Sequence, residues 1–318
     1  MRIKFLNKKI PKSSDQLTLI VCSCDKYSDL WYPYFEIFKN NWPAFPYKIV
    51  LNTETKSYTH DGLDIVCLQL YSESESANIS WSERMIETLK HIDTDYVMLT
   101  CEDDFIVSPV DLEGFARAFD LLRKNRRISM LSFAGRLRAS ERTKWLGDFG
   151  RIPMRKKYRV VLDTAIWRKD ALLRNLVPGE NPWEFEINAT QRALWDFTEY
   201  YRYKNYDEFN DAIPIVNVPY TCGSGIGLSN GVWRWKNPEL FEKYNIKMDF
   251  SIRGYLDKET CKKLSEAAIS GLEEYKREVE DKFFVNLKIQ TIRRLPPRIT
   301  EMFVKIKRII FPGKNRKG

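Results

Sequence analysis

The chain has 318 residues, of which 43% are hydrophobic and 14% aromatic, with only 14 glycines and 14 prolines. This composition is typical of a packed globular protein and excludes a largely disordered one. The net charge of +9 comes from residues 286–318, where ten basic residues accompany one acidic residue. The rest of the chain carries equal numbers of acidic and basic residues. We therefore expect that residues 1–285 do not bind nucleic acid.

The lack of a recognisable targeting segment and the arrangement of the cysteines both predict a reducing compartment. No apolar run reaches the roughly 20 residues that a membrane-spanning helix needs, and residues 1–16 lack the apolar segment of a secretory signal. We therefore expect a cytoplasmic protein. The six cysteines include no C-x-x-C pair, and the chain has two histidines, so we expect reduced thiols and no structural zinc site.

Three apolar runs near the start of the chain predict strands of a parallel or mixed sheet. They are almost continuously apolar, as strands covered on both faces are, and they comprise residues 17–24, 47–52 and 64–70. A short polar loop at 25–29 follows the first run and leads into an amphipathic helix. This alternation of strand and helix predicts an α/β domain.

An acidic cluster follows the most apolar strand of the sequence. Ser80 and Glu83 form a capping-box pattern that opens a helix ending near His91. The strand at 96–101 comes next and stops at Glu102–Asp104. Ligands of open α/β sheets bind beyond the carboxyl ends of strands. Carboxylates at that place suit a hard divalent cation that also binds the phosphates of a nucleotide, although a solvated turn is the alternative interpretation.

Further elements are expected along the rest of the chain. In order, they are a helix at 112–122, a strand at 128–133, a lid-length loop at 135–157, a strand at 158–167, a helix from Asn181 to about Tyr201, a strand at 213–220 and a Gly-rich loop at 223–231. Helical spacing resumes from Asp257. We predict a catalytic domain at 15–250 and a helical, basic C-terminal extension at 251–318.

The order of these elements resembles that of GT-A glycosyltransferases, in particular those encoded with bacterial surface-polysaccharide genes. The likeness continues through residues 165–168, residues 181–186 and the loop glycines up to Gly231, and it covers most of residues 17–240. It implies a Rossmann-type mixed α/β sheet flanked by helices. It also implies transfer of a hexose-type sugar from a nucleoside-diphosphate sugar to a hydroxyl of a glycan or lipid-linked acceptor.

The resemblance assigns ligands for a divalent cation and a nucleotide. It implies that Asp104 and Glu102 hold Mn²⁺ or Mg²⁺ in a D-x-D-type motif, although Glu102 stands where the family usually has Asp. The residues expected to contact the nucleotide are Ser23, Asp25, Lys26, Arg84 and Asp103. A sugar nucleotidyltransferase is the nearest alternative enzyme. It needs a Gly-rich phosphate loop after the first strand, and residues 22–27 contain no glycine.

An inverting transfer also needs a carboxylate that accepts the proton of the acceptor hydroxyl. The resemblance places this base near the start of a helix beyond the metal motif. Glu184 and Glu186 lie in the first turns after Asn181, where the helix dipole favours an ionised carboxylate. We choose Glu186 and keep Glu184 as the other candidate, since acidic residues are common at helix starts in any case. Trp183 could stack on an acceptor ring or anchor the helix in the core.

The basic tail has the pattern of an amphipathic helix. Apolar residues recur every three to four positions over residues 299–310, with basic residues beside them. Such a helix could lie on an anionic leaflet, which predicts peripheral attachment to the inner face of the cell membrane. It could also pack on the body or on a partner helix. A non-enzymatic adaptor that binds anionic membrane or nucleic acid through this tail is the second alternative function.

Overall fold

The computed structural model describes residues 17–137, 145–154, 156, 158–194, 198–204, 226–261 and 263. All but the last few of these belong to one compact unit that ends at Lys258. The predicted strand at 213–220, the start of the Gly-rich loop and the basic tail lie outside the described residues.

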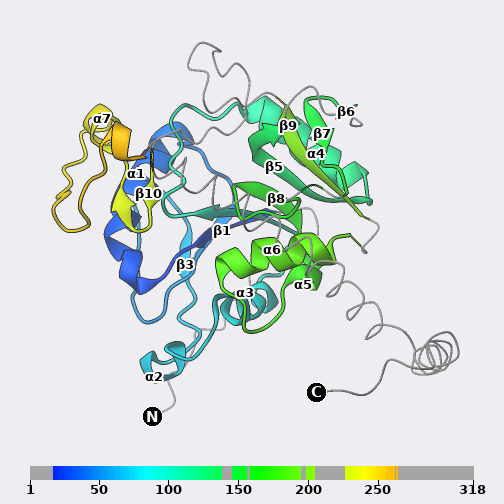
Figure 1. Ribbon diagram of the computed structural model, residues 1–318, viewed down its shortest axis with the longest axis horizontal. Helices are drawn as coiled ribbons and strands as arrows, with labels where there is room; N and C mark the ends of the chain where they lie inside the picture. Colours follow the sequence, from blue (N-terminus) through cyan, green and yellow to red (C-terminus); the bar gives the residue numbers. More distant parts are fainter. Residues whose placement is uncertain are drawn as a thin grey trace, which may run out of the picture. The chain divides into compact units, whose positions relative to one another are not determined.

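The described residues build one mixed sheet of nine strands in the order β3-β2-β1-β4-β8-β5-β9-β7-β6 (Figure 1). The strands are β1 (Leu17–Cys22), β2 (Lys48–Leu51), β3 (Ile65–Cys67), β4 (Tyr96–Cys101), β5 (Ile128–Leu137), β6 (Trp145–Leu146), β7 (Phe149–Arg151), β8 (Ala165–Arg168) and β9 (Glu199–Lys204). Strands β3, β2, β1 and β4 run parallel, whereas β8 is antiparallel to both of its neighbours, β4 and β5. The expected mixed sheet is confirmed, with β4 in its interior beside the middle strand, β8.

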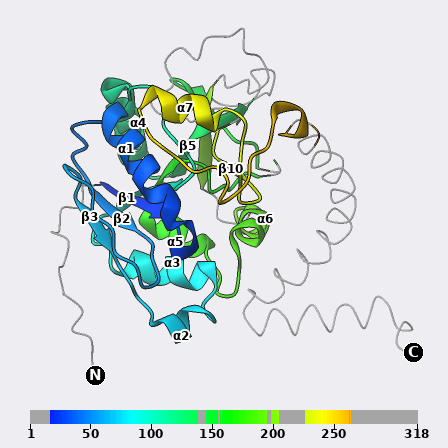
Figure 2. The ribbon, with the colours of Figure 1, turned by 90° about the vertical axis from the view of Figure 1, so that its left-hand side faces the viewer.

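Helices cover both faces of this sheet. They are η1 (Asp25–Leu30, a 3-10 helix), α1 (Trp31–Asn41), α2 (Glu73–Ser76), α3 (Trp81–Lys90), α4 (Leu112–Lys124), α5 (Lys169–Asn175), α6 (Pro182–Arg192) and α7 (Asn237–Lys243). Side chains of α1, α4 and α7 share one hydrophobic core, and those of α3, α5 and α6 share the other. Figure 2 shows these two helical layers above and below the sheet. A small hairpin of β10 (Leu228–Ser229) and β11 (Val232–Trp233) precedes α7.

The two cores explain why the central strands appear in the sequence as nearly continuous apolar runs. In β4, Met98 enters the core beneath α1 and α4, while its neighbours Val97 and Leu99 enter the core beneath α3 and α6. Successive side chains of a strand point to opposite faces, so a strand covered on both sides has apolar residues at most of its positions. This confirms the interpretation of the runs that form β1 and β4.

The predicted helix starts are confirmed. The Ser80 hydroxyl accepts a hydrogen bond from the Glu83 N–H, and the Glu83 carboxylate accepts one from the Ser80 N–H. Asn181 and Glu184 make the same reciprocal pair at the start of α6, where Pro182 occupies the first turn. Each pair satisfies amide groups that a helix end would otherwise leave without partners.

Several predicted boundaries were wrong. The helix after Asn181 ends at Arg192, and Tyr201 lies in β9 beside β5, as suits a segment rich in Tyr. The predicted strand at 158–167 shortens to β8. The expected loop at 135–157 holds the end of β5 and the hairpin of β6 and β7, because strands of two or three residues show no periodicity that a sequence could reveal.

Within the part of the chain that the structure describes, no helix is both long enough and apolar enough to cross a membrane.

Candidate active site

The acidic turn, Glu102–Asp104, reverses the chain at the carboxyl end of β4. The Asp104 N–H donates to the Cys101 carbonyl over 3.1 Å. In return, the Asp104 Oδ2 lies 3.3 Å from the Cys101 nitrogen and 3.4 Å from the Thr164 hydroxyl. These three acidic residues lie where the sequence predicted them, directly after the carboxyl end of the interior strand β4.

Burial makes the ionised forms of these carboxyls unfavourable. Glu102 is only 8% exposed, and its burial, reinforced by the charges of Asp103 and Asp104, raises its pKa well above the usual range. Burial raises the pKa of Asp104 in the same way, and Asp103 and Asp163 add repulsion. A bound divalent cation reverses this balance, because it stabilises ionised carboxylates. The electrostatics of the turn therefore suit a cation.

A second segment, which we call the C-terminal strap (residues 226–256), is fixed to the acidic turn. The Leu228 N–H donates to the Asp103 Oδ2 over 3.1 Å. A Cβ atom added to Gly227 would lie 2.6 Å from the Asp103 carbonyl oxygen, so only glycine permits this approach. The buried amide of Asn237 binds both the N–H and the carbonyl of Gly227, over 3.0 and 2.7 Å. Asp103, expected at the nucleotide, thus contacts the strap through its carboxylate.

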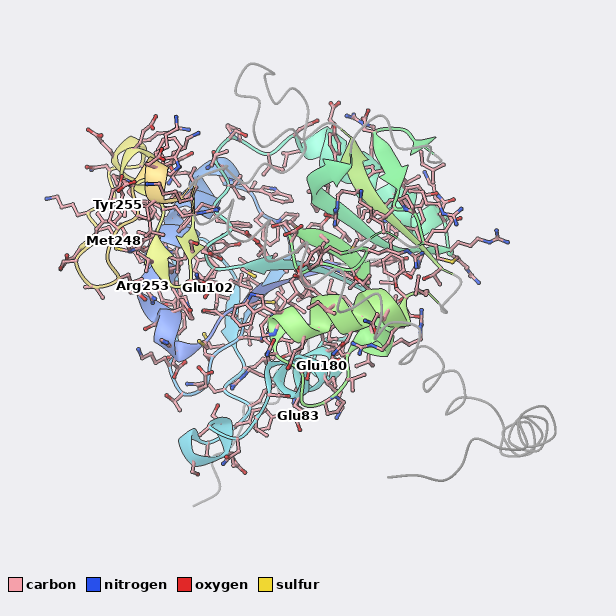
Figure 3. All side chains as sticks on the ribbon, viewed as in Figure 1. Glu83, Glu102, Glu180, Met248, Arg253 and Tyr255 are labelled. Atoms are coloured by element: carbon pink, nitrogen blue, oxygen red, sulfur yellow. The ribbon has the colours of Figure 1, made fainter. Side chains whose placement is uncertain are left out.

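The strap also brings two arginines toward the carboxyls. The Arg253 Nε donates to Asp29 over 2.6 Å, and its guanidinium lies 4.6 Å from the centre of the Tyr27 ring. The positive charge of Arg253 lowers the pKa of Glu102, although burial raises this pKa by more. Figure 3 shows the side chains of Arg253 and Glu102 at this edge of the sheet. The charge of Arg234 likewise lowers the pKa of Asp103, although burial raises this pKa by more. Arg253 and Arg234 therefore act on the carboxyls of the acidic turn through their charge.

The predicted nucleotide residues after β1 lie beside the acidic turn, since Cys22 at the end of β1 pairs with Cys101 at the end of β4. The Ser23 hydroxyl is half-buried and accepts a hydrogen bond from the Trp31 Nε1 over 2.7 Å. The Lys26 side chain is exposed, and its carbonyl accepts a hydrogen bond from Arg253 over 2.9 Å.

The Asp25 carboxylate is occupied by the loop that follows β2. It accepts hydrogen bonds from the amides of Glu54, Thr55 and Lys56 and from the Thr55 hydroxyl, at 2.7 to 3.0 Å. Partial burial would raise the pKa of Asp25, but these hydrogen bonds outweigh it and lower the pKa. We therefore assign this carboxylate to holding the two loops together and not to a nucleotide contact.

Arg84 joins the same network through Glu54, a residue that the sequence analysis missed. Its Nη2 lies 3.2 Å from the Glu54 Oε1, and its Nη1 donates to the Ser76 hydroxyl over 3.0 Å. Glu54 also accepts a hydrogen bond from the Asp25 N–H. The sequence could have indicated Glu54, because this residue follows β2 at the same edge of the sheet as the acidic turn.

The two candidate bases differ in their environment. Glu184 is exposed, and its carboxylate accepts the Asn181 N–H over 2.9 Å as part of the capping box. Glu186 is half-buried, and its Oε1 accepts the Leu162 N–H over 2.8 Å. Two residues further along, Thr164 contacts Asp104. The residues from Leu162 to Thr164 span at most roughly 11 Å, so Glu186 rather than Glu184 is tied to the acidic turn.

Asp163 is a further acidic residue of this edge that the sequence analysis missed. It is exposed, and its charge helps to raise the pKa of Asp104, after the larger effects of burial and Asp103. β8 runs antiparallel to β4 and begins just after Asp163. The start of β8 therefore lies at the carboxyl end of β4, which can be deduced only when the strand direction is known.

The described residues contain no group of three or more His, Cys, Asp or Glu side chains arranged to hold a metal ion. A cation at the acidic turn would therefore need phosphate oxygens and waters to complete its coordination. Mg²⁺ and Mn²⁺ sites in nucleotide-binding proteins are commonly of this kind, with one or two protein carboxylates. Glu102 and Asp104 fit that pattern.

No protein-family model matches the chain, and no curated protein matches it. Among solved structures, it is similar to S. aureus TarS 1-349, with a TM-score of 0.39 and 15% identity over 59% of this chain and 60% of that one. It is also similar to the mannosyltransferase PcManGT from Pyrobaculum calidifontis in complex with GDP-Man and Mn²⁺, with a TM-score of 0.35 and 14% identity over 60% of this chain and 55% of that one. The matched part is thus less than two thirds of either of these chains.

Proposed function

We propose that this chain is a metal-dependent glycosyltransferase that moves a hexose-type sugar from a nucleoside-diphosphate sugar to a hydroxyl of a glycan or lipid-linked acceptor, with inversion at the anomeric carbon. The observation that carries the proposal is the convergence at one sheet edge of the acidic turn, the arginines of the C-terminal strap and the carboxylate of Glu186. Each group has a role in such a transfer.

Charge supports a diphosphate ligand at this edge. Asp104 and Glu102 would hold Mn²⁺ or Mg²⁺ together with phosphate oxygens of the donor. The bound cation neutralises charge on the departing diphosphate. Arg234 would approach the same phosphates from the strap, because a guanidinium group can bind two phosphate oxygens at once. Arg253, which is bound to Asp29, would contribute its positive charge.

The position of Glu186 supports a general base. The acceptor oxygen would attack the anomeric carbon while its proton passes to the Glu186 carboxylate and the bond from the anomeric carbon to the diphosphate oxygen breaks. The electron pair of that bond leaves with the diphosphate. The Leu162 N–H, 2.8 Å from the Oε1, would orient the carboxylate for this proton transfer.

The test is a panel of nucleoside-diphosphate sugars incubated with the purified full-length chain and Mn²⁺, without acceptor. We expect slow release of nucleoside diphosphate and free sugar from at least one donor, abolished by EDTA and by Asp104→Asn. Asp95→Asn is the matched control, because Asp95 lies just before the opposite end of the same strand. Release unaffected by EDTA and by Asp104→Asn would overturn the proposal, and consumption of a donor only with added pyrophosphate would identify a nucleotidyltransferase instead.

The basic tail adds a proposal about location. Its ten basic residues against one acidic residue suit an anionic membrane surface, where each contributes on the order of 1 kcal/mol. Peripheral attachment would bring a lipid-linked acceptor to the active site without a membrane-spanning helix.

A further inference from the structure

The start of α6 presents a large aromatic side chain to solvent. Trp183 is 73% exposed, more than any other large hydrophobic residue that the structure describes. On the other side of the same turn, Phe185 is fully buried and packs on Trp81 with ring centroids 5.2 Å apart. Phe185 therefore packs α6 against α3, whereas Trp183 contributes little to the core.

The backbone that carries Trp183 is fixed from several directions. Glu180 forms a buried, bidentate ion pair with Arg192, which lies at the other end of α6. The Arg192 Nη1 and Nη2 donate to the two carboxylate oxygens of Glu180 over 2.7 and 2.8 Å. The Glu180 N–H also donates to the Ser82 hydroxyl of α3 over 3.0 Å. The capping box between Asn181 and Glu184 closes the first turn around Trp183. A ring on so constrained a backbone loses little conformational entropy when a ligand stacks on it.

Trp183 lies three positions before the proposed base on the same helix. Trp183 and Glu186 are three positions apart on one helix and are therefore neighbours on its surface. Glu186 points toward Leu162 and the segment that leads to the acidic turn. A molecule that covered the Trp183 ring would have one of its groups beside the Glu186 carboxylate.

We propose that Trp183 is the platform on which a sugar ring of the acceptor stacks, so that the acceptor is a glycan whose reacting hydroxyl belongs to, or adjoins, the stacked ring. This inference rests on the proposed function. The C–H face of a sugar ring offers flat apolar area to an aromatic ring, and its hydroxyls remain free for polar contacts. A lipid surface suits the position less well, because the neighbouring Glu184 and Glu186 are acidic and an inserting helix needs a wide apolar face with basic flanks.

The experiment compares acceptor use with donor hydrolysis in the full-length protein. The donor is the one that the nucleotide-sugar panel identifies, and the acceptor probes are a set of methyl and p-nitrophenyl glycosides, with 1-octanol as the hydroxyl that carries no ring. Each variant's kcat/KM for the glycosides is divided by its own rate of donor hydrolysis without acceptor. We expect Trp183→Ala to lower this ratio about tenfold or more, mainly through the acceptor KM, and Trp183→Phe to restore most of it.

Leu112→Ala is the matched control, since Leu112 is 55% exposed at the start of α4; its ratio should equal that of the wild type. Thermal unfolding of each variant verifies the fold. A wild-type ratio in Trp183→Ala, or transfer to 1-octanol that falls as much as transfer to glycosides, would overturn the platform while the proposed function stands. Absence of donor hydrolysis in the wild type would instead refute the proposed function.

Discussion

Replacing Gly227 with Ala should separate backbone strain from contact with the acidic turn. Gly227 has a φ of +81°, which disfavours any side chain, and its added Cβ would lie 2.6 Å from the Asp103 carbonyl oxygen. The backbone term amounts to roughly 1–2 kcal/mol. Forcing the strap away from a backbone atom adds roughly 1–3 kcal/mol. We therefore expect Gly227→Ala to lower the free energy of unfolding by about 2–5 kcal/mol.

Gly179→Ala provides the control for strain alone. Gly179 has a φ of +90°, and no atom lies within 4 Å of its added Cβ, so the expected loss is only the roughly 1–2 kcal/mol of the backbone term. Urea unfolding of both variants, followed by circular dichroism, measures the difference. Equal losses in the two variants would refute the close packing of the strap on the acidic turn. Calorimetric titration with Mn²⁺ and nucleoside diphosphate should show weaker binding only in Gly227→Ala.

Three further changes test the base, the loop network and the tail. Glu186→Gln should lower turnover by roughly 10²–10⁴-fold with donor affinity retained, whereas Glu184→Gln should chiefly lower the melting temperature; the reverse pattern in turnover assays would move the base to Glu184. Asp25→Asn should make the free energy of unfolding fall less steeply as the pH is lowered. A carboxyl whose pKa is lowered in the fold, as that of Asp25 is, stabilises the fold above its unfolded pKa of about 3.9 and loses this contribution as the pH falls through its folded pKa. Unfolding midpoints measured from pH 6 to pH 2.5 check this, and parallel curves for the two proteins would contradict it. Deleting residues 296–318 should release the protein from anionic vesicles and spare transfer to a water-soluble acceptor, and flotation of both forms at low and high salt would show that the tail is not an anchor.

The central half of the fold and the place of the acidic turn could be predicted because their signals are local. Nearly continuous apolar runs indicated β1 and β4, since both faces of these strands are covered. The capping boxes at Ser80 and Asn181 each lie within four consecutive residues. A carboxylate directly after a central strand needs no tertiary knowledge to be placed at the sheet edge.

The other side of the candidate site depends on contacts that no local pattern encodes. Asp103 contacts Leu228, which lies 125 residues later, and an arginine in an irregular segment such as Arg253 carries no signal of its partner. Asp163 was missed because its location depends on the direction of β8, which the sequence left open. Asp25 and Arg84 were selected as ligand residues, yet much of their hydrogen bonding goes to protein groups, in a network that meets at Glu54.

The bond between Arg253 and Asp29 spans 224 residues, and this separation has a consequence for synthesis of the chain. At roughly 5–20 residues per second, Arg253 is made some 10–45 s after Asp29. The strands and helices of the sheet can begin to pack during that time, but the strap that completes the proposed donor site does not yet exist. A nascent or prematurely terminated chain that ends before the strap would thus present the carboxyls of β4 without Arg234 and Arg253. If the proposed function is correct, sugar transfer begins only when nearly all of the unit that ends at Lys258 has been made.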